Sequence, residues 1–386
     1  MPSIYLDHAT TTPIAPQVLE AMLPFLGERF GNPSSPHALG ADARRGIEDA
    51  RAAVAALLRA SPEEILFTSS ATEANNLAVK GLALARGIGR GHLVAAATEH
   101  ISVLHPLRTL ERWGYGLTLL PVDRSGRIDP DDLRRALRPT TILVSVAHAS
   151  AEIGTLQPLA EICRVARGHG VPVHCDATLT TGHLPWPEGE DRPDLITAAP
   201  HLFYGPKGIG ILRLRRGTRI APLIEGGAQE GGLRAGTEAV AAAVGAGAAA
   251  RLAMAEMGRR GARRRRLAGR LARLLDEHLR GFVWTGHRTD RVPGHLSLCV
   301  RGVEAEAMLS ALDERGIVAA SGSACTTEVL KASHVLEAIG LGPVLARGAL
   351  TLSFGAVSRD GDPEEVAAAL PPLVERLRSL SPIPTE

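Results

Sequence analysis

The sequence predicts an α/β protein whose large domain holds a mostly parallel, doubly wound sheet, followed by a smaller α+β domain. Three observations support this. Short β-rich runs alternate with longer helical patterns through the first two thirds of the 386 residues, as in doubly wound folds. Several expected strands are continuous apolar runs, as in strands covered by helices on both faces. At about 100–200 residues per domain, the chain is also too long for one small module.

Seven strands are expected in the large domain, at 65–68, 93–97, 117–122, 142–148, 171–177, 195–199 and 208–214. Helical patterns lie between them at 41–59, 73–85, 102–113 and 159–169. Ligands of such sheets bind at the carboxyl ends of the strands, where loops meet helix N-termini, so candidate site residues are sought there.

A long helical region at 237–280, rich in Ala and Arg, connects the large domain to the second unit. The remainder predicts strands near 295–300, 317–321 and 349–355 and helices near 304–314, 329–339 and 363–377. We place the large domain at residues 15–250. The small domain comprises residues 1–14 and 251–386 and carries the loop that contains Cys325.

Composition excludes several classes of protein. Hydrophobic residues make up 45% of the chain and charged residues 22%, which excludes a disordered chain, collagen and a small disulfide-stapled domain. The four cysteines include no CxxC pair. The first residues, MPSIYLDHATTTP, lack the features of a signal peptide, and no run approaches the ~20 uninterrupted apolar residues of a membrane span. We expect a cytoplasmic protein with no membrane partner.

The net charge of +2 gives no general attraction to nucleic acid. Residues 259–273 do hold eight arginines, but no aromatic residues are interleaved to stack on bases. A solvated helix face explains these arginines better, and we expect no nucleic-acid partner.

Four local segments carry groups suited to chemistry. SSATE, residues 69–73, follows a strand and opens a helix, which suits an anion or simple helix capping. Asp176 ends an apolar strand, where a buried carboxylate needs a cationic ligand or a structural ion pair. RAGT, residues 234–237, closes a Gly-rich loop with a hydroxyl. Cys325 lies in a small polar loop before a helix, where its pKa would be lowered.

Eight segments in order along the chain form one combined signature: IYLDHATTTP, FGNPSSPH, TSSATEANNLAVKG, TEH, DAT, YGPKGIG, RAGT and SGSAC. Their order and spacing resemble the cysteine desulfurases, in the class V aminotransferase group of pyridoxal-phosphate (PLP) enzymes. The resemblance runs from about residue 4 to about residue 380. It implies PLP-transferase fold type I, a mobile cysteine loop on the small domain, and a homodimer.

The resemblance also implies a role for each matching residue. In the family, PLP is an electron sink held as a Schiff base, and a cysteine attacks the sulfur of the substrate–PLP adduct, leaving alanine and an enzyme persulfide. Cys325 matches that cysteine. The implied cofactor-binding residues are Thr72, His201 and Thr237 at the phosphate, His100 stacked on the ring and Asp176 at the pyridinium nitrogen. Thr237 would reach in from the other subunit, and no metal ligand is implied.

The chain departs from the family at the Schiff-base lysine, which is replaced by Leu202. Leucine can neither form the covalent link nor move a proton. Four further polar positions of the family pattern hold Ala151, Leu179, Ala199 and Thr351. The three lysines of the chain, Lys80, Lys207 and Lys331, do not occupy the lost position. Apolar replacement of groups that would otherwise lie buried without partners is typical of an emptied pocket.

We interpret the chain as a cysteine desulfurase-like protein that has lost ordinary PLP-dependent chemistry and binds no cofactor covalently. It would act as a homodimer, or as a heterodimer with a related desulfurase, and handle sulfur for an acceptor protein. The alternative is an enzyme that uses PLP or pyridoxamine phosphate (PMP) non-covalently, with His201 or His183 as base. A third interpretation, a cysteine-ligated metal or iron–sulfur scaffold using Cys325, lacks clustered cysteines.

Overall fold

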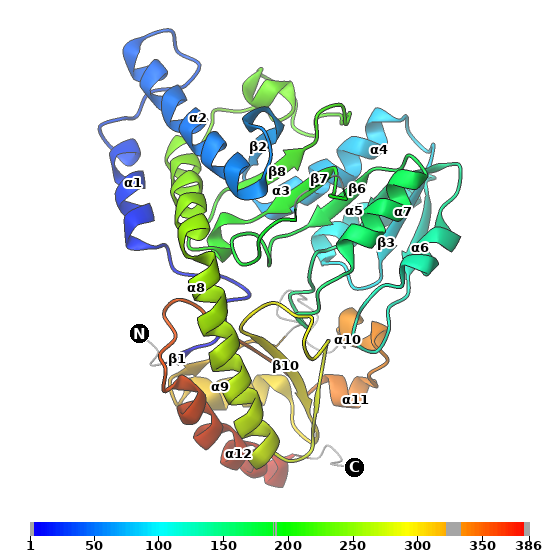
Figure 1. Ribbon diagram of the computed structural model, residues 1–386, viewed down its shortest axis with the longest axis vertical. Coiled ribbons are helices and arrows are strands. Elements are labelled where there is room, and N and C mark those ends of the chain that lie inside the picture. Colours follow the sequence, from blue (N-terminus) through cyan, green and yellow to red (C-terminus); the bar gives the residue numbers. More distant parts are fainter. Residues whose placement is uncertain (1–3, 188, 190, 322–332, 382–386) are drawn as a thin grey trace.

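A seven-stranded sheet forms the centre of the large domain in the computed structural model, which describes residues 4–187, 189, 191–321 and 333–381 (Figure 1). Its strands lie in the order β2-β8-β7-β6-β5-β3-β4. Four neighbouring pairs are parallel, whereas β8 runs antiparallel to both β2 and β7. The bounds are β2 Ile65–Thr68, β3 His92–Ala96, β4 Gly116–Leu120, β5 Thr141–Ser145, β6 Val173–Asp176, β7 Leu195–Ala198 and β8 Gly210–Leu214. The predicted mostly parallel α/β sheet is confirmed.

Helices cover both faces of this sheet because alternate strand residues point to opposite sides. Val94, Val144 and Ile196 pack into one apolar core, and their neighbours Leu93, Leu143 and Leu195 into another. The first face is covered by α2 Ala38–Leu58, α6 Pro130–Ala136, α7 Leu159–Gly168 and part of α8. The second is covered by α3 Ala71–Asn76, a π-helical turn at Leu77–Gly81, α4 Leu82–Ala85 and α5 Ile101–Arg112. The fold is therefore doubly wound.

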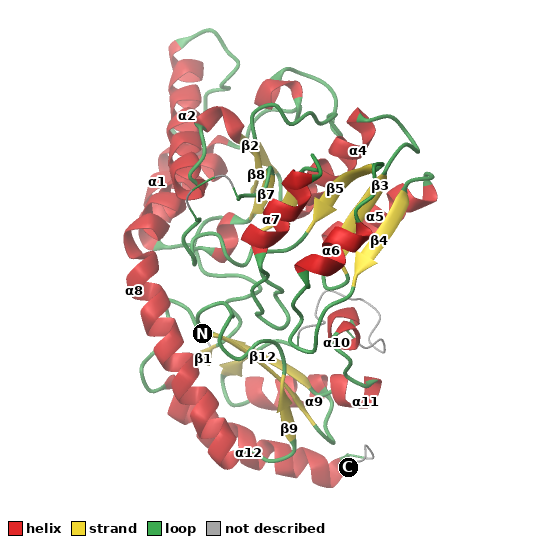
Figure 2. Ribbon diagram, turned by 45° about the vertical axis from the view of Figure 1, so that its right-hand side comes forward, coloured by secondary structure: helices red, strands yellow, loops and turns green. Residues whose placement is uncertain are grey.

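A 39-residue helix, α8 Val240–His278, runs along one side of the molecule from the large domain to the small one (Figure 2). Its first half packs against α1 Pro16–Leu26 and α2, and its second half against α12 Asp362–Leu380. Gly247 permits the close approach to α2, because a Cβ there would lie 2.5 Å from the Cα of Ala50. Among the described residues, α8 is also the one helix long and apolar enough to cross a membrane, a test that buried core helices pass as well.

The small domain contains a three-stranded antiparallel sheet, in the order β12-β10-β9, and a short parallel pair of β1 with β11. Ile4 and Leu6 of the N-terminal segment pack with Leu271 and Leu298 in its apolar core. The strands are β1 Ile4–Tyr5, β9 Phe282–Trp284, β10 His295–Val300, β11 Ile317–Val318 and β12 Ala349–Ser353. The remaining helices are α9 Ala305–Asp313, α10 His334–Ala338 and α11 Pro343–Ala346, and 3-10 turns lie at Pro62–Glu64, Pro200–Leu202 and Gln229–Gly232.

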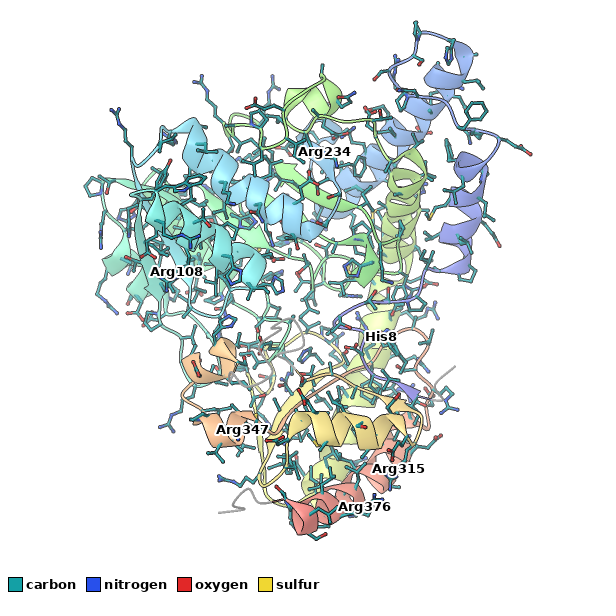
Figure 3. The ribbon with its side chains drawn as sticks, turned by 180° about the vertical axis from the view of Figure 1, so that it is seen from behind. His8, Arg108, Arg234, Arg315, Arg347 and Arg376 are labelled. Carbon is teal, nitrogen blue, oxygen red and sulfur yellow. The ribbon has the colours of Figure 1, made fainter. Side chains whose placement is uncertain are left out.

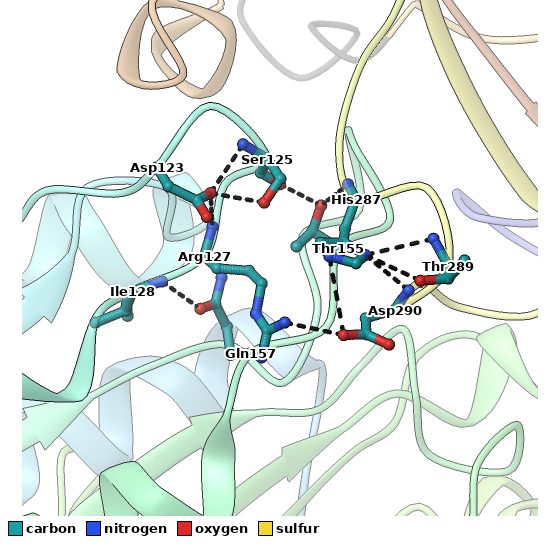
Figure 4. Close-up of polar contacts among 9 residues, drawn as sticks. All are labelled: Asp123, Ser125, Arg127, Ile128, Thr155, Gln157, His287, Thr289 and Asp290. Atoms are coloured by element: carbon teal, nitrogen blue, oxygen red, sulfur yellow. Dashed lines mark hydrogen bonds and ion pairs between the residues drawn. The ribbon is translucent and has the colours of Figure 1, made fainter.

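Polar contacts join loops 123–128 and 153–157 of the large domain to the 285–291 segment of the small domain (Figure 4). The hydroxyl of Thr155 donates to the carbonyl of Ser125 at 2.6 Å and accepts from the backbone amide of His287 at 2.9 Å. Arg127 forms an ion pair of 2.9 Å with Asp290. These contacts hold the 285–291 segment of the small domain against the strand ends of the large one.

Three of the described helices, α1, α6 and α11, are not among those that the sequence pattern predicts. The α6 helix has only seven residues, and its start depends on local capping, since Asp129 accepts a hydrogen bond from the amide of Asp131 and Pro130 occupies the first turn. Such short helices show too few turns for a periodic apolar signal.

The predicted solvated face of the 259–273 segment is largely correct but wrong at Arg264. Arg259, Arg265, Arg266, Arg270 and Arg273 are exposed, and Arg260 and Arg263 are half-buried. Arg264 is only 5% exposed. The helix turns that one position toward the junction of the two domains, where it lies beside His183.

Candidate functional site

Asp176 lies at the carboxyl end of central strand β6, with only 5% of its surface exposed. Its Oδ2 accepts a hydrogen bond of 2.8 Å from the amide of Asn75, and its Oδ1 accepts one of 3.0 Å from the backbone N–H of Thr178. The same Asn75 amide donates to the hydroxyl of Ser102 at 2.8 Å. Within the described residues the buried carboxylate therefore has two neutral donors and no ion pair.

His100 is joined to this network through Ser102, whose hydroxyl lies 2.7 Å from Nδ1 of the imidazole. His100 also caps α5, because the same nitrogen accepts from the backbone N–H of Ser102. Loss of solvent around the ring lowers the pKa of His100, while the nearby Asp176 carboxylate opposes that shift. The imidazole is therefore neutral at neutral pH, on the same network as Asp176.

Two residues of this network, Asn75 and Ser102, are not among the predicted site residues. Glu99 is a third buried polar group beside them. Its Oε1 accepts from the backbone N–H of Ala147 at 2.6 Å, while its Oε2 has no partner. Complete burial, with a further contribution from Asp176, raises the pKa of Glu99 well above its ordinary value. The sequence signal for all three is their position in the family-like segments. Asn75 lies in ATEANN, Glu99 lies in TEH, and Ser102 follows TEH by two residues.

The two hydroxyl-bearing loops predicted at the phosphate meet through an ion pair. Arg234 Nε lies 3.0 Å from Glu73 Oε1, and the other oxygen of Glu73 accepts from the backbone N–H of Ser69. Ser70 caps α3 by accepting from the backbone N–H of Glu73. Thr72 and Thr237 are both exposed and belong to these joined segments.

Glycine at 210 allows the Ser70 turn to rest on strand β8. A Cβ at Gly210 would lie 2.2 Å from the backbone carbon of Ser70, closer than any side chain permits. The Ser70 hydroxyl is used in capping α3. The exposed hydroxyls of this region that could contact a phosphate are those of Thr72 and Thr237.

The turn that carries His201 and Leu202 is held by the N-terminal ATTTP segment. Thr12 donates to the carbonyl of His201 from both its amide, at 2.9 Å, and its hydroxyl, at 2.8 Å. Thr11 Oγ1 lies 3.3 Å from Nδ1 of His201. Burial, and secondarily the charge of Lys207, lowers the pKa of His201. The imidazole is therefore neutral and held in place by groups far away in the sequence.

Leu202, which the resemblance implies stands in place of the family lysine, is buried with 6% exposure, and its carbonyl accepts a 2.7 Å hydrogen bond from Nε2 of His183. The other nitrogen of His183 lies 2.9 Å from the guanidinium of Arg264. With both ring nitrogens engaged, His183 has no free lone pair to act as a base. Lys207 is exposed, and Lys331 lies outside the described residues.

The other four residues at which the resemblance implies a departure from the family pattern are Leu179, Ala199, Thr351 and Ala151. Leu179 packs with Ala9, Ala149 and Val292 in a small apolar cluster, and Ala199 is 1% exposed. Thr351 is buried and its hydroxyl donates to the carbonyl of Glu152 at 3.2 Å. Ala151 is exposed, and its carbonyl accepts from His295 at 2.8 Å.

Glu152 forms a contact between the domains, since its carboxylate accepts from the hydroxyl of Ser333, the N-cap of α10. Burial raises the pKa of Glu152 to about 7, against the lowering effect of that hydrogen bond. No local sequence pattern indicates that Glu152 titrates near neutral pH.

Cys325, the candidate persulfide residue, lies outside the described residues. The other three cysteines, Cys163, Cys175 and Cys299, are buried and unpaired. Burial raises the pKa of Cys163 and of Cys299 to about 12 and that of Cys175 well above its ordinary value. Over the part of the chain that the structure describes, no three His, Cys, Asp or Glu side chains are grouped so that they could hold a metal ion.

Comparisons with known proteins agree with the resemblance seen in the sequence. A model of the family "Aminotransferase class-V" matches residues 4–360. The chain is 42% identical over 383 residues to cysteine desulfurase IscS of Dictyoglomus turgidum, covering 99% of this chain and 97% of that protein. It is 40% identical over 379 residues to cysteine desulfurase IscS 1 of Archaeoglobus fulgidus, covering 98% and 99%.

Solved structures are similar over nearly the whole chain as well. A NifS-like protein superposes with a TM-score of 0.89 at 30% identity, covering 98% of this chain and 99% of that one. DndA from Streptomyces lividans superposes with a TM-score of 0.78 at 35% identity, covering 91% and 99%.

Proposed function

Because this chain belongs to the class V aminotransferase family and is a full-length homologue of cysteine desulfurases, we propose that it is a desulfurase-fold protein without ordinary PLP-dependent desulfurase activity. It serves instead as a dimer-forming or sulfur-handling partner. The family depends on PLP, so the proposal turns on whether the residues around Asp176 fit that cofactor.

The observation that carries the proposal is the aliphatic side chain at position 202. Leu202 is buried in the turn that follows β7, and leucine offers neither an amine for covalent attachment nor a group that accepts a proton. Lys207, five residues further on, is exposed. The residues present therefore do not fit a covalently held cofactor.

The contacts around Asp176 and Leu179 also support the loss of PLP-dependent desulfurase activity. The carboxylate of Asp176 is satisfied by Asn75 and Thr178, and Leu179 is part of an apolar cluster. A buried polar group left without a partner costs about 1–3 kcal/mol, so these neighbours stabilise the site when nothing is bound.

Sulfur handling is assigned to Cys325. Its thiolate would attack the outer sulfur of a persulfide on a donor enzyme, forming a new S–S bond while the donor cysteine leaves as a thiolate, so that no external oxidant is required. Cys163, Cys175 and Cys299 are buried with raised pKa values, which disfavours them as competing acceptors.

The test has two arms. The purified protein, supplied with PLP and cysteine, is expected to release no alanine, and borohydride reduction is expected to leave no pyridoxyl mass on the chain. Given an active desulfurase and cysteine, the protein is expected to gain one persulfide sulfur at Cys325, and Cys325→Ser to gain none. Alanine production at an ordinary desulfurase rate would refute the loss of activity, and absence of persulfide would refute the sulfur-handling role.

A second candidate function is an enzyme that uses PLP or PMP without a covalent bond. The Asp176–Asn75–Ser102–His100 network favours it, because a carboxylate and a neutral imidazole remain beside each other at the strand ends. Of the two proposed bases, only His201 keeps a ring nitrogen without a hydrogen-bond partner among the described residues, whereas both nitrogens of His183 are engaged. Retention of PMP through gel filtration, lost in Asp176→Ala, would favour this candidate.

A further inference from the structure

Among the residues that the structure describes, Arg264 is a buried cation without an acidic partner. It lies in the middle of α8, at the junction of the two domains, with 5% of its surface exposed. One guanidinium nitrogen, Nη1, donates to Nδ1 of His183 at 2.9 Å. The other two, Nε and Nη2, are shielded from solvent and have no hydrogen-bond partner within residues 4–321 and 333–381 as far as these are described. Arginine stays protonated in proteins, so this group carries a full positive charge inside the molecule.

His183 cannot supply the missing negative charge. Its Nε2 donates to the carbonyl oxygen of Leu202 at 2.7 Å, because a carbonyl only accepts. Its Nδ1 must then be the acceptor for Arg264, since a guanidinium only donates. The imidazole is thereby fixed in its neutral form, and burial together with Arg264 lowers its pKa well below the ordinary value.

The remaining neighbours are neutral or positive. His8 is buried, and neither ring nitrogen has a partner in the described part of the chain; its pKa falls to about 3 because of burial and the charge of Arg264. Arg260 lies over the ring of Tyr204, 4.5 Å from its centre. The hydroxyl of Tyr204 accepts from the backbone N–H of Ala356 at 2.6 Å. Figure 3 shows His8 between the large and the small domain.

The packing around the side chains of Arg264 and His8 is close. A Cβ at Gly294 would lie 2.8 Å from the Cβ of Arg264, and one at Gly355 would lie 2.3 Å from the ring of His8. A multi-atom ligand such as a nucleotide does not fit such close packing. A buried charge requires a counter-charge or hydrogen-bond acceptors, and a single halide-sized ion supplies both.

We propose that Arg264 forms an interior binding site for a small monovalent anion of the size of chloride, held by Nε and Nη2 at the domain junction. The site is separate from the Asp176 network. It is linked to the turn of Leu202 through the hydrogen bonds from Arg264 to His183 and from His183 to the Leu202 carbonyl. Occupancy of the anion site therefore helps to position the 200–204 turn.

The direct test is a crystal of the full chain grown in sodium bromide. An anomalous difference peak is expected within hydrogen-bond distance of Nε or Nη2 of Arg264. Density there without anomalous signal would identify water instead and overturn the proposal.

The solution test compares thermal unfolding in sodium chloride and in sodium gluconate at equal ionic strength. A bound ion stabilises the native state with the logarithm of its concentration, so the wild-type melting temperature is expected to rise in chloride and not in gluconate. Arg264→Leu is expected to lose the difference between the two salts. The matched control Arg265→Leu, at the adjacent exposed position, is expected to keep it. Equal salt responses in the two variants would overturn the proposal.

If Arg264→Leu does not fold, Arg264→Lys serves as the second variant. Lysine keeps the charge but places one ammonium group where the guanidinium offers two unpartnered nitrogens with three N–H donors. A weaker chloride dependence is expected, with the midpoint shifted to higher chloride. An unchanged midpoint would contradict the assignment of the ion to Nε and Nη2.

Discussion

The side-chain amide of Asn75 donates a 2.8 Å hydrogen bond to Oδ2 of Asp176, across 101 positions of sequence. Asn75 belongs to α3 and Asp176 ends β6, so the contact joins a helix to the end of the central strand. Both side chains are buried. The carboxylate that the resemblance implies as a cofactor ligand is thus held by an amide of the chain itself.

Asn75→Ala is expected to lower the free energy of unfolding by about 1–3 kcal/mol, because Asp176 and Ser102 each lose a buried donor. Urea denaturation measures the change. The control is Asn76→Ala, whose amide bonds only to the carbonyl of Thr72 at the surface. A loss for Asn75→Ala no greater than that for Asn76→Ala would contradict the buried network.

Leu202→Lys is expected to restore covalent attachment of PLP but little desulfurase activity. The new amine would enter a buried position, yet Ala151, Leu179, Ala199 and Thr351 would still lack the polar groups of the family pattern. Borohydride reduction followed by peptide mass mapping locates the adduct, and Lys207→Gln in the same background excludes attachment there. Activity equal to that of a competent desulfurase would show that the other four positions matter little.

Glu152 predicts a pH dependence of stability. Because burial raises its folded-state pKa to about 7, the folded protein binds more protons than the unfolded one between the ordinary carboxyl pKa and 7. Its contribution is therefore fully present at low pH and is lost as pH rises toward 7. Relative to wild type, Glu152→Gln is expected to gain about 1–3 kcal/mol between pH 5 and 8.

Urea titrations at several pH values check this expectation, since glutamine still accepts from Ser333 but cannot titrate. The exposed Glu161→Gln provides the control. Parallel stability curves for wild type and Glu152→Gln would rule out titration of Glu152 in this range.

Alkylation of the native protein is expected to modify one cysteine much faster than the others. Cys163, Cys175 and Cys299 are buried and their thiols are kept protonated by raised pKa values, so Cys325 is expected to react first. Peptide mass spectrometry after brief iodoacetamide treatment identifies the site, and the same treatment in urea provides the reference in which all four react. Equal labelling in the native state would argue against a poised thiol.

The exposed Thr237 is expected to serve a second subunit. If the chain pairs with a lysine-bearing relative, co-expression should give a heterodimer with an interface of at least ~2,000 Å². The PLP affinity of the relative should then fall when Thr237→Ala is introduced in this chain. A sequence-neighbour control is Glu238→Gln. If only homodimers form, or if the PLP affinity of the relative is unchanged by Thr237→Ala, simple retention of the family fold explains the presence of Thr237 better.

Much of the large domain was predictable because its strands are short, apolar runs bounded by helical patterns. The expected strands at 65–68 and 195–199 match β2 and β7 closely. The antiparallel insertion of β8 between them was not predictable, since the direction of a strand depends on partners distant in the sequence. The helix α6 was missed because capping, rather than periodicity, starts it.

For the site, the amino-acid order alone shows that position 202 holds leucine and that Asp176 ends a strand, because identity and local pattern need no partner. Only the tertiary structure shows that Asn75 bonds to Asp176 and that both nitrogens of His183 are engaged. It also shows that Arg264 is the one buried residue among the eight arginines of the 259–273 segment. The physical reason is that burial and hydrogen bonding are properties of pairs. The groups that raise or lower a pKa, or leave a charge without a partner, come from segments that only the packing of the two domains brings together.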